Sequence, residues 1–116
     1  MSRLRLAFVV LLALLAMVAT VVAFSGRGTW FNVGLGACGQ YNNNNQLVAA
    51  LNSAQYSNGA YCGKQAIVNG PNGQVQVTIV DECPGCGYGS LDLSPAAFSR
   101  LANLNAGDIP ISWNWA

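Results

Sequence analysis

The sequence contains no histidine, and only 8% of its 116 residues are charged. The absence of histidine excludes zinc sites with histidine ligands, and it excludes Ser-His and Cys-His nucleophile systems. A nucleic-acid or anionic-membrane partner would require a clustered basic patch, which five scattered Lys and Arg residues do not form. An uncharged partner fits this composition better.

Much of the hydrophobicity is concentrated at the N-terminus. Arg3 and Arg5 precede a long apolar run that closes with small residues at the −3 and −1 positions accepted by signal peptidase. We expect residues 1–23 to be a cleaved secretory leader and residues 24–116 to be one mature domain with no membrane contact. The alternative is a retained membrane anchor, because the run is nearly long enough to span a bilayer. Without the leader, three basic residues remain against four acids, a net charge of −1.

Four cysteines fall in the predicted mature domain: Cys38, Cys62, Cys83 and Cys86. An even number of cysteines in a secreted domain this small indicates disulfides. A zinc site made of four cysteines normally needs two close pairs, and the first two cysteines are far apart in the sequence, so we expect no metal site. The sequence by itself permits three pairings.

Short segments bounded by Gly, Asn and Pro predict a mainly β domain of the small-barrel or sandwich type. The clearest strand is 74–81, where apolar and polar residues alternate. It follows the turn sequence NGPNG, so we expect a hairpin with residues 65–68. Another strand is expected over residues 28–33. Alternation in the C-terminal segment IPISWNW places Trp113 in the core.

Two helices are expected between the strands. The first is predicted over residues 45–54, with Asn45 as its N-cap and the leucine and valine side chains facing inward. The second is predicted over residues 94–104, where Ser94 is a good N-cap followed by proline at the first helical position. This boundary places Asp92 at the end of a short strand, just before the start of a helix.

Four segments, in this order, carry a resemblance to a known family: GTWFNVGLGACG, YCGKQAIV, VQVTIVDECP and SLDLSPAAFSRLANLNAGDIPISWNW. They resemble the first domain of expansins and are similar to bacterial expansin-like proteins, single-domain fungal loosenins, and barwin-like and rare-lipoprotein-A-type domains. The resemblance implies a six-stranded double-psi β-barrel with two short helices and no second carbohydrate-binding domain. It also implies a secreted protein that binds cell-wall polysaccharide, such as cellulose or chitin, and loosens it largely without hydrolysis. We expect a monomer that needs no cofactor.

The resemblance assigns roles to particular residues. Asp92 matches the aspartate on which wall loosening by expansins depends, Thr29 matches the threonine beside it, and Asp81 matches a second acid in the same groove. The aromatic residue that some expansins carry two positions after that acid is here Cys83. A structural alternative for Asp81 is that it ends its strand by binding loop amides around Cys83. Asp92 has less reason to be a helix cap, because Ser94 already caps that helix.

Two exposed rings are the candidates for stacking on sugars, Trp30 and Tyr88. The pair of cysteines in CPGC is a candidate for thioredoxin-like redox chemistry, which requires a helix N-terminus after the first cysteine. PGCGYGS is a poor helix start, so we expect a structural bridge between Cys83 and Cys86. The remaining cysteines would then pair with each other, although the cross-pairings stay open.

Conventional glycoside hydrolysis requires two carboxylates flanking the bond. Related endoglucanases place their base just after the segment that matches TWF, where this chain has Asn32, and no acid occurs between Phe24 and Val80. A conventional hydrolase is therefore not expected. Two alternatives remain: a glycan-cleaving enzyme (endoglucanase or lytic transglycosylase) using Asp92 as the acid, and a barwin-like or natriuretic-peptide-like defence or signalling protein. Burial and the nearby Asp81 are expected to raise the pKa of Asp92.

Overall fold

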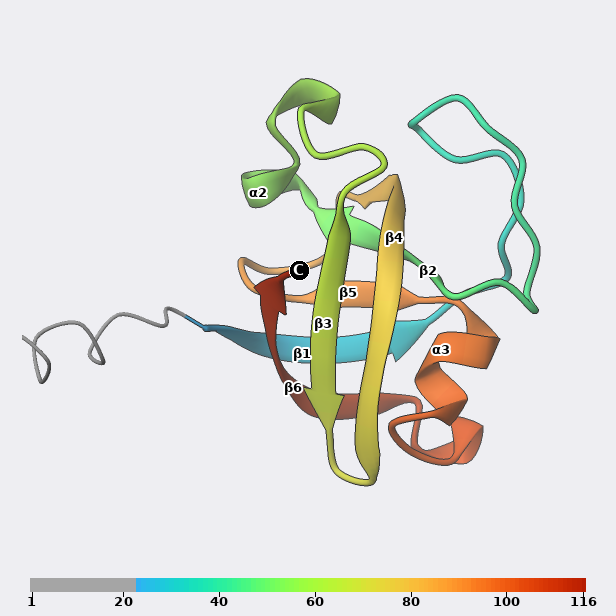
Figure 1. Cartoon of the computed structure of the whole chain (residues 1–116), viewed down its shortest axis with the longest axis vertical. Helices are drawn as coiled ribbons and strands as arrows, with labels where there is room; N and C mark the ends of the chain where they lie inside the picture. Colours follow the sequence, from blue (N-terminus) through green and yellow to red (C-terminus); the bar gives the residue numbers. More distant parts are fainter. Residues whose placement is uncertain (1–22) are drawn as a thin grey trace, which may run out of the picture.

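The computed structural model describes residues 23–116, which form a double-psi β-barrel of six strands with two short α-helices (Figure 1). The predicted leader, residues 1–23, lies outside the described residues apart from Ala23. The strands are β1 (Phe24–Trp30), β2 (Val48–Asn52), β3 (Gln65–Gly70), β4 (Gly73–Cys83), β5 (Leu91–Leu93) and β6 (Asp108–Trp115). The helices are α2 (Ser53–Tyr56) and α3 (Pro95–Ser99), with 3-10 turns η1 (Ser57–Gly59) and η2 (Leu104–Ala106). No helix within residues 23–116 has the length and apolar character needed to cross a membrane.

The strands close into a barrel in the order β1-β5-β2-β4-β3-β6, with β6 returning to β1. Two neighbouring pairs are parallel, β1 with β5 and β2 with β4, and the other four pairs are antiparallel. The predicted hairpin is confirmed, because β3 and β4 pair antiparallel across the turn that contains Pro71. In this order β5 and β3 are three places apart, so they lie on opposite sides of the barrel (Figure 1).

The core is built by the alternation of side chains along the strands, which sends every second residue into the barrel. Val75, Val77 and Ile79 point inward from β4, and Trp113 is completely buried on β6, as the sequence predicts. The second predicted helix is also confirmed, although it is shorter than expected. The Ser94 hydroxyl accepts a hydrogen bond from the amide of Ala97, and α3 closes the barrel with buried apolar side chains.

The helix predicted over residues 45–54 is wrong. Half of this segment is the strand β2, in which all five residues are buried, and α2 begins only at Ser53. The run VAAL lacks polar positions because β2 lies between β4 and β5 and all of its residues are buried. The N-cap is accordingly Asn52, whose side-chain oxygen accepts a hydrogen bond from the amide of Gln55. The first strand is also displaced, since β1 begins at Phe24 and ends at Trp30.

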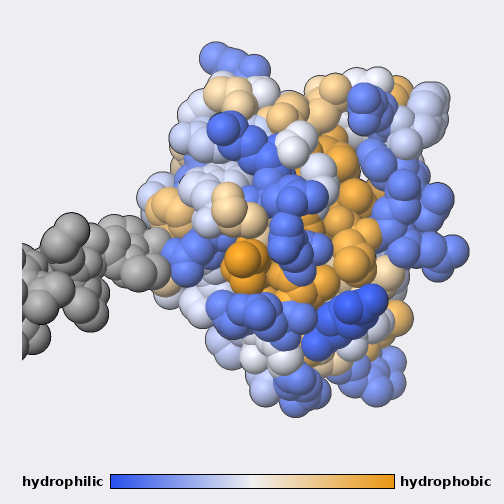
Figure 2. Space-filling model, in the orientation of Figure 1, coloured by the Kyte–Doolittle hydropathy of each residue, from blue (hydrophilic) through white to orange (hydrophobic). Residues whose placement is uncertain are grey.

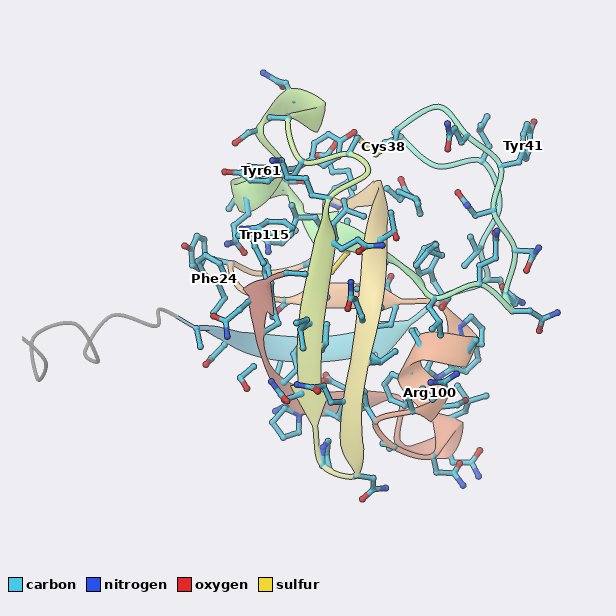
Figure 3. All side chains as sticks on the ribbon, in the orientation of Figure 1. Phe24, Cys38, Tyr41, Tyr61, Arg100 and Trp115 are labelled. Carbon is cyan, nitrogen blue, oxygen red and sulfur yellow. A yellow bond between two sulfur atoms is a disulfide. The ribbon has the colours of Figure 1, made fainter. Side chains whose placement is uncertain are left out.

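Both disulfides have the predicted pairing. Cys83 and Cys86 close the turn after β4, and Cys38 joins Cys62 across a sequence separation of 24 residues. The longer bridge fastens the loop 31–47 to the connection between α2 and β3, and Figure 3 labels Cys38 beside that connection. The loop therefore projects from the barrel but is covalently fixed near its middle.

The surface in Figure 2 is largely hydrophilic around its edges. Apolar residues are exposed in the depression beside β4, between the β3–β4 hairpin and the loop 31–47. The loop itself carries two of the large hydrophobic residues with high exposure, Leu35 at 59% and Tyr41 at 80%.

Candidate functional site on the outer face of the barrel

Three of the four acids of the chain lie in one row across the barrel, which we call the acid row. Strand register pairs Asp108 with Thr29, Thr29 with Asp92, Asp92 with Ala50, and Ala50 with Asp81. Residues in register on adjacent strands point to the same face, and neighbouring strands lie about 4.8 Å apart. The row therefore runs across five strands, and the small, buried side chain of Ala50 separates Asp92 from Asp81.

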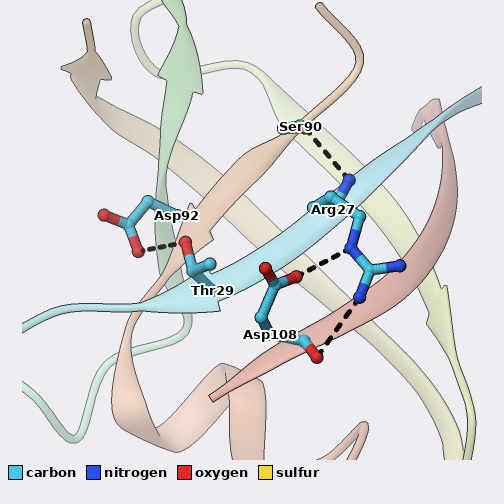
Figure 4. Close-up of polar contacts among 5 residues, drawn as sticks. All are labelled: Arg27, Thr29, Ser90, Asp92 and Asp108. Carbon is cyan, nitrogen blue, oxygen red and sulfur yellow. Dashed lines mark hydrogen bonds and ion pairs between the residues drawn. The ribbon is translucent and has the colours of Figure 1, made fainter. Parts of the chain in front are cut away.

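Asp92 is the central acid of the row. Its neighbours Leu91 and Leu93 are completely buried, so the strand alternation turns Asp92 to the outside of the barrel. The Thr29 hydroxyl donates a hydrogen bond of 2.9 Å to the carboxylate of Asp92 (Figure 4). The predicted neighbourhood of these two residues is thus present in the structure.

The three-residue strand β5 is held by the buried serines on either side of it. The Ser90 hydroxyl accepts a hydrogen bond of 3.0 Å from the amide of Arg27 (Figure 4). The Ser94 hydroxyl donates a 2.6 Å hydrogen bond to the carbonyl of Gln46. Gly89 brings β5 against β1, because it has a φ of +80° and a Cβ there would lie 2.1 Å from the Ser25 carbonyl oxygen. These contacts fix the position of Asp92 relative to Thr29.

The pKa of Asp92 is raised above its ordinary value of 3.8. Burial of the carboxyl group is the largest cause, because it disfavours the charged form. The hydrogen bond from Thr29 opposes this effect, and the negative charge of Asp81 adds to it. Asp92 therefore holds its proton to a higher pH than a solvated aspartic acid would.

Asp81 has a structural task as well as its place in the row. One of its carboxylate oxygens accepts hydrogen bonds of 2.8 Å from the amides of Ala37 and Glu82. The first of these bonds ties the loop 31–47 to the end of β4, next to the disulfide at Cys38. The amide of Glu82 adjoins Cys83, as expected. The amide of Ala37 belongs to a different loop from the one expected.

Asp108 is a member of the row that the sequence analysis missed. Its carboxylate lies 2.7 Å from the Nε of Arg27, and both side chains are more than half exposed (Figure 4). Only the antiparallel register of β6 against β1 brings Asp108 beside Thr29. The two residues are 79 positions apart in the printed sequence, so no local pattern could have revealed this neighbour.

A family model described as lytic transglycolase matches residues 23–113 of the chain. An EG45-like domain containing protein of Citrus jambhiri is 38% identical over 92 residues, which cover 69% of this chain and 70% of the relative. The chain belongs to the expansin-like double-psi β-barrel family.

Solved structures agree with this assignment. A mutant of Clavibacter michiganensis expansin in complex with cellohexaose has a TM-score of 0.77 and 36% sequence identity. That match covers 82% of this chain and 50% of the expansin, so the chain spans about half the length of that relative. The Streptomyces papain inhibitor has a TM-score of 0.73 and 29% identity, with 84% of this chain and 97% of the inhibitor covered.

The expansin-like barrel carries Asn32 where the related endoglucanases are expected to have their base. The side-chain oxygen of Asn32 accepts a hydrogen bond of 3.1 Å from Asn44. Asn44 in turn accepts a hydrogen bond of 2.8 Å from the amide of Val33. Asn32 therefore belongs to a network of amides that holds the base of the loop 31–47, and it offers no carboxylate to the acid row.

The two predicted sugar-stacking rings are not close to each other. Trp30 ends β1 next to Thr29, is 37% exposed, and donates a hydrogen bond from its indole to the carbonyl of Leu104. Tyr88 is 65% exposed and contacts the ring of Phe24, at the opposite end of β1. Six residues of extended strand span about 20 Å. Strand alternation turns Trp30 away from the face on which Thr29 lies, and Tyr88 is at the far end of β1, so neither ring belongs to the acid row.

The described part of the chain, residues 23–116, contains no group of three His, Cys, Asp or Glu side chains placed to hold a metal ion. The four cysteines are all paired in disulfides. The acid row itself contains a half-buried carboxyl group, a hydroxyl group and two further carboxyl groups.

Proposed function

We propose that this protein is secreted, binds cell-wall polysaccharide across the acid row, and loosens the polysaccharide without net hydrolysis. The family assignment supports this role, as does the likeness to an expansin solved with cellohexaose. The N-terminal pattern of basic residues, apolar run and small residues supports secretion.

The observation that carries the proposal is the unequal state of the three carboxylates in the row. Asp108 is paired with Arg27, and Asp81 receives two backbone amides. Asp92 faces one hydroxyl, and burial raises its pKa. A scheme with two carboxylates requires a second, unoccupied base or nucleophile opposite the acid. The acids of this row supply one proton donor and two carboxylates that already have partners.

A protonated Asp92 donates a hydrogen bond to a sugar hydroxyl or to a glycosidic oxygen. Such a bond contributes about 1 kcal/mol net, similar to one of the bonds that it replaces between neighbouring glycan chains. The exchange is therefore nearly balanced, and the protein separates chains locally without breaking a covalent bond. Thr29 keeps the Asp92 carboxyl in place and leaves its second oxygen free for the glycan.

The proposal is tested by the weakening of cellulose sheets under constant load. We expect Asp92→Ala, which removes the donor, to reduce the rate of weakening by about fivefold, since loss of a hydrogen bond of about 1 kcal/mol has that effect. Glu82→Ala is the matched control, because it removes the one acid outside the row and should retain most of the activity. Equal weakening by wild type and Asp92→Ala would refute the role given to Asp92.

A second candidate function is lytic cleavage, which the description of the matching family model favours. In that reaction a hydroxyl of the same sugar attacks the anomeric carbon, the glycosidic C–O bond breaks, and the hydroxyl proton is balanced by the proton given to the leaving oxygen. One acid that also serves as base is sufficient, so Asp92 meets the minimum requirement. Products with an internal anhydro ring, formed by wild type and absent with Asp92→Asn, would establish this function.

A third candidate is a surface that binds another protein. The Streptomyces papain inhibitor is covered almost completely by this chain. The disulfide-fixed loop 31–47 presents Leu35 and Tyr41 to solvent, as an inhibitory loop would. Inhibition of papain that is lost in Tyr41→Ser and retained in Asp92→Asn would favour this candidate over glycan loosening.

A further inference from the structure

Aromatic residues gather around the ends of β1 and β6 that lie away from the acid row. Figure 3 labels three of them on one side of the molecule: Phe24 from the start of β1, Tyr61 before β3, and Trp115 at the end of β6. The rings of Tyr61 and Trp115 are stacked, with centroids 4.8 Å apart and planes 8° from parallel. Phe24 also contacts Tyr88 edge-on at 6.4 Å. We call Phe24, Tyr61, Tyr88 and Trp115 the aromatic face.

The stacked pair separates two hollows, and both rings line both of them. One hollow, of about 670 Å³, is lined by the stacked pair with Lys64, Gln65 and Gln76. The other, of about 260 Å³, is lined by the pair with Phe24, Tyr88, Gln55 and Ser57. The larger volume is in the usual range for sites that bind small molecules.

The polar groups of the larger hollow are already oriented. The side-chain amide of Gln76 donates a hydrogen bond of 2.6 Å to the side-chain oxygen of Gln65. Lys64 lies over the ring of Tyr61, with its Nζ 5.9 Å from the centroid. Each hollow thus combines aromatic rings with amides or a hydroxyl, and no Asp or Glu side chain is among the described residues that line either one.

We propose that the aromatic face is a second glycan-binding surface, which takes neutral sugar rings against Tyr61, Trp115 and Tyr88. Sugar rings have apolar C–H faces that stack on aromatic rings, and their hydroxyl groups exchange hydrogen bonds with amides. A single cation among the lining residues does not provide the basic cluster that an anionic membrane surface attracts. This proposal goes beyond the proposed function, because it gives the barrel two separate contacts with polysaccharide.

The position of the aromatic face makes it independent of Asp92. Trp115 ends the strand β6 that Asp108 begins, and Phe24 begins the strand β1 near whose end Thr29 lies. The two regions are therefore about 17 to 23 Å apart along these strands. One glycan chain at each face would place the barrel between two chains. A protein held in this way separates neighbouring chains more effectively than one that touches a single chain.

The three tryptophans provide a direct test. The indole of Trp30 donates to Leu104 and that of Trp113 to Gly89, whereas the indole of Trp115 has no hydrogen-bond partner among residues 23–116. The full chain, labelled with ¹⁵N, is titrated with cellohexaose while the three indole signals are followed by NMR. We expect the Trp115 signal to shift and saturate, and to do so equally in Asp92→Asn.

Two variants of the aromatic face complete the test. Tyr61→Leu and Tyr88→Leu should each weaken the binding reported by Trp115 by about threefold to tenfold, because one ring contact is lost. The matched control is Tyr41→Leu, which removes a tyrosine that is 80% exposed and lies outside both hollows. Tyr88 is 65% exposed, so its replacement should leave the fold intact even if that of Tyr61 does not.

Three results would overturn the second surface: a Trp115 signal that stays fixed at saturating cellohexaose, a shift that disappears in Asp92→Asn, or equal affinity in Tyr88→Leu and Tyr41→Leu. Binding to phosphatidylglycerol vesicles, or dimerisation, in place of cellohexaose binding would overturn it as well. Absence of sheet weakening by the wild-type protein, with an intact Trp115 titration, would instead contradict only the proposed function.

Discussion

The acid row and the aromatic face lie toward opposite ends of strands β1 and β6, and they are built in different ways. The acid row takes one residue from each of five strands, and strand register fixes its members. The aromatic face takes Phe24 and Trp115 from the ends of β1 and β6, and it takes Tyr61 and Tyr88 from connections between strands. Strand register holds the acid row rigidly, which suits a carboxyl group whose protonation must be controlled. The rings at strand ends and in connections suit stacking on a sugar surface.

The two regions also differ in their electrostatics. Asp92 is half-buried beside another acid, and this environment alters its proton affinity. The aromatic face has one cation beside it, Lys64, and the contacts proposed with sugar depend on the area of the rings and on side-chain amides. Changes of pH should therefore affect the acid row and leave binding at the aromatic face almost unchanged.

The largest effect should come from the disulfide that connects the two regions. Cys38 follows Ala37, which binds Asp81, and Cys62 follows Tyr61 of the aromatic face. Replacement of both cysteines by serine should lower the free energy of unfolding by about 3.5 kcal/mol, since this bridge closes a long loop. The same change at Cys83 and Cys86 should cost about 2 kcal/mol.

Urea unfolding of the two double variants measures this difference. The Cys38 and Cys62 variant should also shift both the Ala37 amide and the Trp115 indole in NMR spectra. An equal loss of stability in both variants, or a shift confined to one face, would contradict the link between them.

A smaller effect is expected from Thr29→Val, which should act on the acid row alone. The Thr29 hydroxyl lowers the pKa of Asp92, so its removal should raise that pKa further. Weakening that requires protonated Asp92 should then persist to a higher pH than in wild type, and unfolding should become easier by about 1 kcal/mol. Thr78→Val is the matched control on β4. A pH profile that is unchanged, or displaced toward lower pH, would show that Thr29 does not tune Asp92.

The smallest effect concerns stability and pH. Because the folded pKa of Asp92 is raised, the ionised carboxylate destabilises the fold once the pH exceeds that pKa. Asp92→Asn should therefore increase the melting temperature by a few degrees at pH 7, and this gain should disappear as the pH falls below the ordinary value of 3.8. Calorimetry across this range, with Asp108→Asn as control, measures it. A variant less stable than wild type at pH 7 would mean that the Thr29 hydrogen bond outweighs burial.

Local sequence signals predicted the parts of the fold that depend on neighbouring residues. Alternation identified β4 and the buried Trp113, and the Ser-Pro pair located the start of α3. The segment that became β2 was misassigned, because its four apolar residues fit a buried strand and a helix equally well. Only pairing with β4 and β5 decides between them, and that pairing is not a local property.

The parts of the candidate site that could be predicted were those implied by the family resemblance. Resemblance placed Asp92 beside Thr29, and the structure has that contact. Asp108 was missed, because only the register of β6 against β1 brings it beside Thr29. The contact of Tyr88 with Phe24 depends on loop packing, which no local pattern predicts. The stacking of Tyr61 on Trp115 joins residues 54 positions apart, and no periodic pattern in the sequence predicts it.

The central claim is that one carboxylic acid loosens polysaccharide without cutting it. The most direct measurement follows the mechanical weakening of a cellulose sheet and, in the same sample, the reducing ends and anhydro ends released into solution and left on the fibre. We predict weakening by wild type with no increase in either kind of chain end. Chain ends that increase in proportion to the weakening, and that are absent with Asp92→Asn, would contradict the claim and identify the protein as a glycan-cleaving enzyme.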